Sequence, residues 1–216
     1  MMVVQLAEAR DPHQDATDAA WIDLLKENLV SLAADAGGTP RPDSKQVVLK
    51  VMDEDCIIDF KERAISYARS ERGAVEGDLR ILILHYLQGC GKAQLANKLV
   101  TFREFEGGAL YYTAFKTRSI DLLVRTFGQK TEVLRQIGDA IRAEPMNMGD
   151  VGFKAYFFPK MPVVVVVWLG DDEVPSSANV LFDANAGKIL PTEDISHLGG
   201  TLCAWLAKLE RTTSGA

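Results

Sequence analysis

Cysteine is scarce in this chain of 216 residues, which contains only Cys56, Cys90 and Cys203. The three are widely separated, and no Cys-x-x-Cys pair occurs. Zinc ribbons, four-cysteine iron–sulfur clusters and disulfide frameworks all need more thiols at closer spacing. An odd number of separated cysteines is typical of reduced, buried thiols in a reducing compartment. The cysteine content therefore excludes these cysteine-built centres and predicts a cytoplasmic protein.

Long hydrophobic runs are also missing. The longest apolar stretch covers residues 161–169 and contains Pro162, whereas a membrane-spanning helix needs about 20 apolar residues. The first residues, MMVVQLAEARDPH, have no basic segment ahead of an apolar one, so we expect no signal peptide. The sequence predicts a protein without a membrane partner.

Positive charge is in deficit, because 24 Lys and Arg stand against 30 Asp and Glu, a net charge of −6. This balance argues against nucleic-acid binding, which needs a basic face. The charge is uneven: residues 92–135 hold eight basic and four acidic side chains, and residues 170–194 hold six acidic side chains and Lys188. The asymmetry is compatible with an anionic ligand near the first segment and a cation near the second, or with two differently charged solvated faces.

Hydrophobic periodicity predicts alternating helices and strands. Helices are expected over residues 15–36, 79–88, 113–127 and 131–143 and from about 191 onward, and strands over 47–51, 56–60, 99–105, 153–158 and 163–168. Residues 39–42 read as a short linker, and residues 62–72 as either a helix or an irregular connector. Asp78 is the expected N-cap of a helix that is apolar on nearly all sides and therefore buried. Five consecutive valines, 163–167, predict a central strand covered on both faces.

These elements predict an α+β fold with a single domain: a central mixed or antiparallel sheet, a buried helix, and amphipathic N- and C-terminal helices. We divide the chain into an N-terminal helix and linker (1–42), a main domain (43–211) and a frayed tail (212–216).

Three segments carry a family resemblance: LILHYLQG (82–89), FREFEGGALYYTAFKTRSIDLLVRTFG (102–128), and PVVVVVWLGDDEVPSSANVLFDANAGKILPTEDISHLGG (162–200). They resemble an uncharacterised prokaryotic domain family of anaerobes, some relatives of which are fused to a four-cysteine iron–sulfur module like those beside corrinoid enzymes. The resemblance implies a role near anaerobic redox or corrinoid chemistry and assigns no catalytic residue. Because this chain lacks those cysteines, electron transfer would require an iron–sulfur or corrinoid partner.

A set of residues is a candidate for cofactor binding. His85 in an apolar helix could be an axial ligand to a haem iron or a corrinoid cobalt, or a core histidine bonded to a backbone carbonyl. The arginines and tyrosines of the basic segment suit a carboxylate or phosphate beside a flat ring, or surface ion pairing with Asp121. The full candidate set is His85, Arg103, Tyr111, Tyr112, Arg118, Arg125 and Trp168.

A second set is a candidate for Mg²⁺ or Ca²⁺, which prefer oxygen ligands. It comprises Asp171, Asp172, Glu173, Asp183, Glu193 and His197, with Asp194 beside the last two. The alternative is that these acids cap loops and the start of a helix. His197, four residues after Glu193, could be a general acid or ligand, or form an ordinary intrahelical ion pair.

No nucleophile elbow, phosphate-binding loop or dinucleotide fingerprint occurs. We therefore expect a non-catalytic binding or accessory protein of anaerobic redox or corrinoid metabolism. It would hold a tetrapyrrole-like or other anionic planar cofactor, or dock an iron–sulfur or corrinoid partner. The alternatives are a metal-dependent enzyme that uses the acidic loops with His197, and a pure protein-interaction module.

Overall fold

A computed structural model describes residues 12–214 of the chain. The N-terminal segment in which we expect no signal peptide lies outside this range up to residue 11, and so do the last two residues of the predicted tail. The helices are α1 (Pro12–Leu24), α2 (Leu29–Ala36), α3 (Gly77–Gly89), α4 (Gly108–Arg118), α5 (Ile120–Phe127), α6 (Thr131–Ala140), α7 (Ala186–Ile189) and α8 (Thr192–Ser214), with 3-10 turns η1 (Pro42–Ser44), η2 (Ser70–Arg72) and η3 (Phe102–Glu104). The strands are β1 (Thr39–Arg41), β2 (Gln46–Val51), β3 (Glu54–Asp59), β4 (Ala64–Tyr67), β5 (Leu99–Thr101), β6 (Glu144–Pro145), β7 (Val151–Phe158), β8 (Met161–Trp168) and β9 (Ser177–Asp183).

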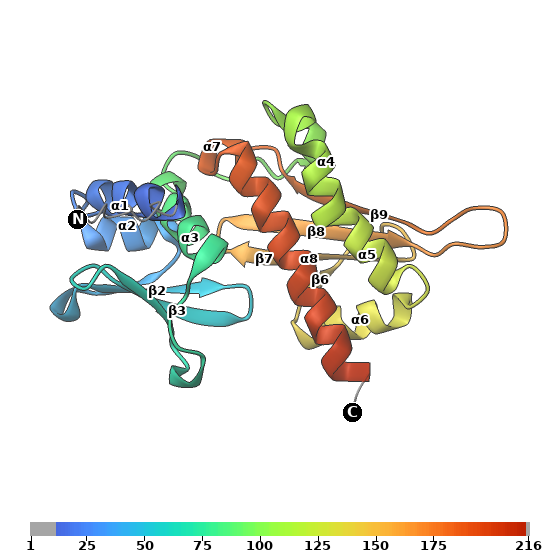
Figure 1. Cartoon of the computed structure of the whole chain (residues 1–216), viewed down its shortest axis with the longest axis horizontal. Coiled ribbons are helices and arrows are strands. Elements are labelled where there is room, and N and C mark those ends of the chain that lie inside the picture. The colour runs from blue at the N-terminus through green and yellow to red at the C-terminus, as the bar shows by residue number, and fades with distance from the viewer. Residues whose placement is uncertain (1–11, 215–216) are drawn as a thin grey trace, which may run out of the picture.

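The α+β class and the antiparallel pairing are confirmed, and the strands form two sheets (Figure 1). The smaller sheet has the order β1-β2-β3-β4, and the larger has the order β5-β9-β8-β7-β6. The two strands expected at residues 47–51 and 56–60 are present as β2 and β3 and form a hairpin, with Val47 paired to Ile58 and Leu49 to Cys56. Every second residue of β2 is buried, as expected for a strand with one face toward a core.

The valine-rich strand β8 is central in the larger sheet, as predicted. Val163, Val165 and Val167 join the main core, and Val164 and Val166 lie in a smaller cluster with Leu181. Met146 and Met148 pack against this second cluster. Both faces of the strand are therefore buried, and the second face is covered in part by methionine side chains.

The two sheets share one core. Tyr86 of α3 lies at their junction: its hydroxyl donates to the Ala36 carbonyl (2.8 Å) and accepts from the Lys160 N–H (3.2 Å), and its ring stacks on Phe158 with centroids 4.3 Å apart. The backbone N–H of Met52 donates to the Phe157 carbonyl across the sheets (2.8 Å). A single hydrophobic cluster runs through both halves.

Several local expectations differ from the structure. The N-terminal helix is broken into α1 and α2, because the Asn28 side chain accepts from the N–H groups of Val30 and Ser31 (both 3.0 Å) and starts a new helix. Gly37 ends α2 in the left-handed conformation. The stretch read as a linker forms β1 and enters η1, and residues 62–72 contain β4 and η2.

The remaining differences concern helix ends. The predicted strand 99–105 is strand only as far as Thr101, and Ser119 divides the predicted helix 113–127 into α4 and α5. Asp78 is the second residue of α3, and the N-cap position belongs to Glu76. The last helix continues to Ser214, into the segment expected to fray. Over residues 12–214, no helix has the length and apolar character needed to cross a membrane.

Candidate functional site

Two reciprocal histidine–aspartate contacts join α3 to α8. His85 Nδ1 lies 2.6 Å from Asp194 Oδ2, and His197 Nδ1 lies 3.0 Å from Asp78 Oδ2. The two α3 residues are seven positions apart, about two helical turns, so they lie on one face of the helix. The two α8 residues are three positions apart and are also neighbours. Each helix thus supplies one imidazole and one carboxylate to the crossing.

The alternative in which His85 is bonded to a backbone carbonyl is not what the structure shows. Its Nδ1 contacts a carboxylate from another helix, and its side chain is 25% exposed while that of Asp194 is 13% exposed. In the described part of the chain, the Nε2 of His85 has no hydrogen-bond partner. The ring is therefore oriented at one nitrogen and available at the other.

The second contact extends to Arg118, whose Nη1 lies 3.3 Å from His197 Nε2. A guanidinium has only donors, so Nε2 accepts, and the proton on Nδ1 is donated to Asp78. The contacts that run from the Asp78 carboxylate through the His197 imidazole to the guanidinium restrain one edge of Arg118 at the end of α4.

A hollow of about 330 Å³ lies beside Arg118. Arg125 of α5 lines it together with Arg118, and the hydroxyl-bearing Thr117 and Thr201 are also in its wall. The rest of the lining is His197, Asp78, Leu122, Gly200 and Ala204. Two arginines therefore line one hollow on a surface made by α3, α4, α5 and α8.

The break at Ser119 places these two arginines. Ser119 is buried and caps the C-terminal end of α4. Its N–H donates to the Phe115 carbonyl (2.9 Å), and its hydroxyl donates to the same oxygen. Gly200 allows α8 to approach, since a Cβ there would lie 3.1 Å from the Arg118 Cβ. Asp121, which was considered as an ion-pair partner for the arginines, contacts Lys116.

The other predicted cofactor residues lie outside the hollow. Arg103 stacks over the Tyr112 ring, 3.7 Å from its centroid, and Tyr111 packs against the main core. Trp168 is the last residue of β8, where it pairs with Ser177. The predicted cofactor set is therefore split between separate parts of the surface.

Two of the acidic candidates for a metal site, Asp171 and Asp183, hold backbone N–H groups. Asp171 Oδ1 accepts from the N–H groups of Val174 (2.7 Å) and Glu173 (2.9 Å), which hold its pKa below the ordinary value. Asp183 is buried and accepts from the N–H groups of Ala96, Asn97 and Asn185 at 2.7–2.9 Å. Asp172 and Glu193 are exposed. Within residues 12–214, no three His, Cys, Asp or Glu side chains are grouped so that they could hold a metal ion.

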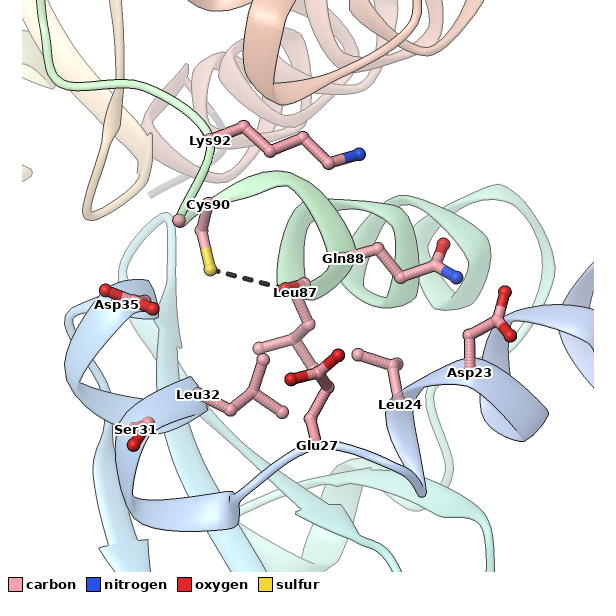
Figure 2. A pocket seen from close by; sticks show the side chains of 11 residues that line it. Asp23, Leu24, Glu27, Ser31, Leu32, Asp35, Leu87, Gln88, Cys90 and Lys92 are labelled. Atoms are coloured by element: carbon pink, nitrogen blue, oxygen red, sulfur yellow. Dashed lines mark hydrogen bonds between the residues drawn. The ribbon is translucent and has the colours of Figure 1, made fainter.

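A second hollow, of about 410 Å³, was missed from sequence (Figure 2). Asp23, Glu27 and Asp35 line it from α1, the α1–α2 connection and α2, and Lys92 lines it from beyond the end of α3. Cys90 lies here with its Sγ 3.3 Å from the Leu87 carbonyl, and burial raises the pKa of this thiol to about 11. No sequence signal predicts this hollow, because its walls come from segments that are brought together only by tertiary packing.

Fold and site together define a two-sheet α+β protein with a cationic hollow where α4 and α5 meet α8. The chain belongs to the family described as Domain of unknown function (DUF3786), whose model matches residues 28–205. The match confirms the resemblance to an uncharacterised domain family and includes every residue that lines the hollow. No curated protein and no solved structure matches the chain.

Proposed function

We propose that this protein is a non-catalytic binding protein for a ligand that carries a carboxylate or phosphate group, held between Arg118 and Arg125. The observation that carries the proposal is that both arginines line one hollow and that His197, itself bonded to Asp78, orients the first of them. A preoriented guanidinium loses less freedom on binding, and its paired N–H groups match the oxygens of these anions.

The size of the hollow limits the ligand. A volume of about 330 Å³ is near the lower end of the ~300–1,000 Å³ typical of ligand sites. It suits a compact anion, or the anionic end of a larger molecule such as the side-chain carboxylate of a tetrapyrrole. The hydroxyls of Thr117 and Thr201 would supply further donors.

Titration calorimetry with inorganic phosphate and with citrate tests this proposal. We expect saturable binding by the wild type, weakened about 10- to 100-fold in Arg118→Gln and in Arg125→Gln, since a hydrogen bond to a charged group contributes about 1.5–3 kcal/mol. Lys116→Gln is the matched control, because it removes a cation of α4 that does not line the hollow. Absence of saturable binding, or an equal loss in the control, would contradict the proposal.

A second candidate function follows from His85. A metal-bound histidine usually donates its other ring N–H to a carboxylate, which is the relationship of His85 Nδ1 to Asp194. With Nε2 available and the side chain partly exposed, His85 could ligate the haem iron or corrinoid cobalt of a docked partner. Such ligation would be the physical basis of the expected link to redox or corrinoid metabolism.

Absorption titrations with haemin and with cobalamin address the second candidate. We expect a shift of the Soret or corrin band with the wild type and none with His85→Gln, while phosphate binding is retained. If haemin or cobalamin gave the same spectrum with the wild type and with His85→Gln, ligation by His85 would be contradicted. That result would not bear on the proposed anion site.

A further inference from the structure

Exposed apolar side chains gather at two places on the described chain. One group lies where α1 turns into α2 and includes Leu25 and Val30, 42% and 51% exposed. The other lies in the loop that joins β8 to β9 and includes Leu169 and Val174, 49% and 62% exposed, next to Trp168. Figure 1 shows these two places at opposite ends of the longest axis of the molecule. Exposed apolar side chains that gather on a surface are typical of interaction sites.

The loop between β8 and β9, residues 169–176, forms an ordered acidic tip. The Asp150 carboxylate accepts from the Leu169 N–H (2.7 Å), and the Asp171 N–H donates to the Val174 carbonyl (2.9 Å). The tip carries Asp171, Asp172 and Glu173 and no basic residue. It therefore presents apolar side chains and negative charge on a backbone that is already folded.

The α1–α2 end has the complementary character. A groove of about 400 Å³ is lined by Leu25, Val30 and the edge of the otherwise buried Phe60. Lys45 and Lys61 lie at this groove, and Glu27 is the acidic residue in its lining. Its walls are otherwise largely aliphatic, so the groove suits an apolar segment that carries negative charge.

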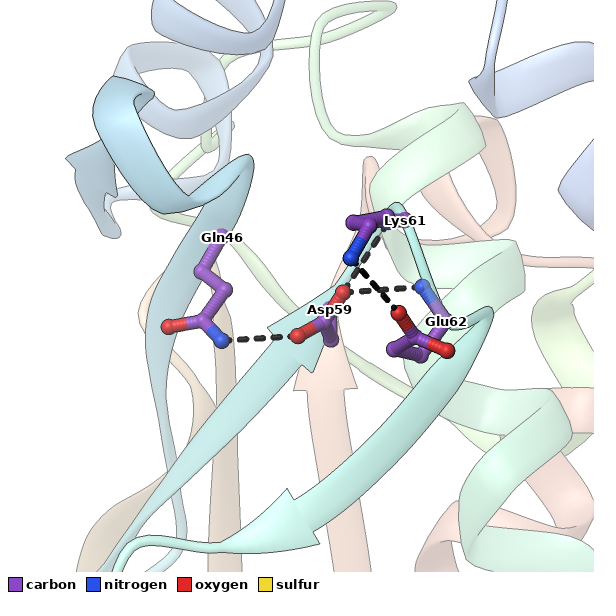
Figure 3. Close-up of polar contacts among 4 residues, drawn as sticks. All are labelled: Gln46, Asp59, Lys61 and Glu62. Atoms are coloured by element: carbon purple, nitrogen blue, oxygen red, sulfur yellow. Dashed lines mark hydrogen bonds and ion pairs between the residues drawn. The ribbon is translucent and has the colours of Figure 1, made fainter.

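Lys61 is held at the groove by a structured turn (Figure 3). Asp59 Oδ1 accepts from the N–H groups of Lys61 (3.0 Å) and Glu62 (2.9 Å), and Gln46 donates to Asp59 Oδ2 (2.7 Å). The Lys61 ammonium lies 3.2 Å from the Glu62 carboxylate. Among residues 12–214, no carboxylate is paired with the Lys45 ammonium, which leaves its charge available to an incoming acid.

We propose that the acidic tip of one copy of this chain docks into the α1–α2 groove of a second copy. Lys45 and the apolar side chains of the groove match the acids and apolar side chains of the tip, and the positions of the two surfaces at opposite ends exclude contact within one molecule. The contact is head-to-tail, so each copy retains a free tip and a free groove, and assembly continues unless the rotation closes a ring. A loop in a groove buries little area, so the association is weak and concentration-dependent.

Sedimentation with complementary variants tests this inference. The tip variant carries Asp172→Lys and Val174→Ser, and the groove variant carries Lys45→Asp and Val30→Ser. All four positions are exposed, and Leu110→Ser, 79% exposed on α4, is the matched control. We expect the mass of the wild type and of the control to rise with concentration up to about 1 mM, the weak end of specific association, and each double variant to stay monomeric.

The decisive sample is an equimolar mixture of the two variants. The intact groove of the tip variant accepts the intact tip of the groove variant, so the mixture forms a dimer that cannot extend. Circular dichroism verifies folding, and the single charge changes Asp172→Lys and Lys45→Asp replace any double variant that fails to fold. A monomeric wild type, an unchanged assembly in both variants, or a mixture that stays monomeric overturns the inference. Saturable uptake of decanoate by a monomeric wild type would overturn it in favour of a small amphiphile.

Discussion

The imidazole of His85 and the carboxylate of Asp194 meet at 2.6 Å although the two residues are 109 positions apart. The contact links the helix between the two sheets to the long C-terminal helix, and it lies one turn of α8 from the His197 contact that orients Arg118. Stability and the proposed ligand binding therefore depend on the same helix crossing.

Replacing either partner of this contact should destabilise the fold. We expect His85→Gln and Asp194→Asn each to lower the free energy of unfolding by about 1–3 kcal/mol, since a partly buried polar group loses its partner. A double-mutant cycle in urea should give a coupling of about 0.5–3 kcal/mol. Additive effects of the two changes would show that the pair contributes no interaction energy.

Asp183 should act as a structural residue. It is buried and accepts hydrogen bonds from the backbone of Ala96, Asn97 and Asn185. We expect Asp183→Asn to cost about 1–3 kcal/mol, because its amide nitrogen cannot accept from those N–H groups, and exposed Asp172→Asn to change stability by less than about 0.5 kcal/mol. Melting curves with Mg²⁺ or Ca²⁺ should match those without. Stabilisation by either ion that Asp183→Asn abolishes would support the metal-site hypothesis instead.

Asp59 predicts an acid dependence of stability. Hydrogen bonds from the Glu62 N–H and the Gln46 amide hold the pKa of Asp59 below its ordinary value of 3.8. The unfolded chain then binds the proton more readily, so the contribution of Asp59 is present above about pH 4 and is lost as the pH falls through the lower folded value. Unfolding in urea between pH 6 and 3 should show a shallower acid loss in Asp59→Asn than in the wild type. An Asp43→Asn control, in η1, should retain the wild-type slope.

The cysteines should be inert in the native protein. Burial raises the pKa of Cys56 to about 12 and that of Cys90 to about 11, and it raises the pKa of Cys203 as well. Since the thiolate is the reactive form, an aromatic disulfide reagent at pH 8 should react slowly with the folded protein and quickly with all three thiols in urea. Rapid labelling of Cys90 alone would show that the hollow in Figure 2 opens.

Three residues singled out from the sequence line one hollow. Arg118, Arg125 and His197 were candidates on residue type and charge, and the structure brings them to one hollow. Arg103 and Tyr112 contact each other elsewhere. The sequence also indicated that His85 would need a partner, because an imidazole in an apolar helix must be paired. The sequence contained no signal that Asp194 is this partner, because the start of a helix already accounts for an acidic residue at that position.

By itself the sequence determined the approximate helical segments, the strands β2 and β3 and the buried valine strand, because hydrophobic periodicity acts over a few neighbouring residues. Only the tertiary structure decided that the strands divide into two sheets and that α3 crosses α8. The partners of His85 and His197 follow from that crossing, since contacts between residues more than a hundred positions apart depend on how whole helices pack.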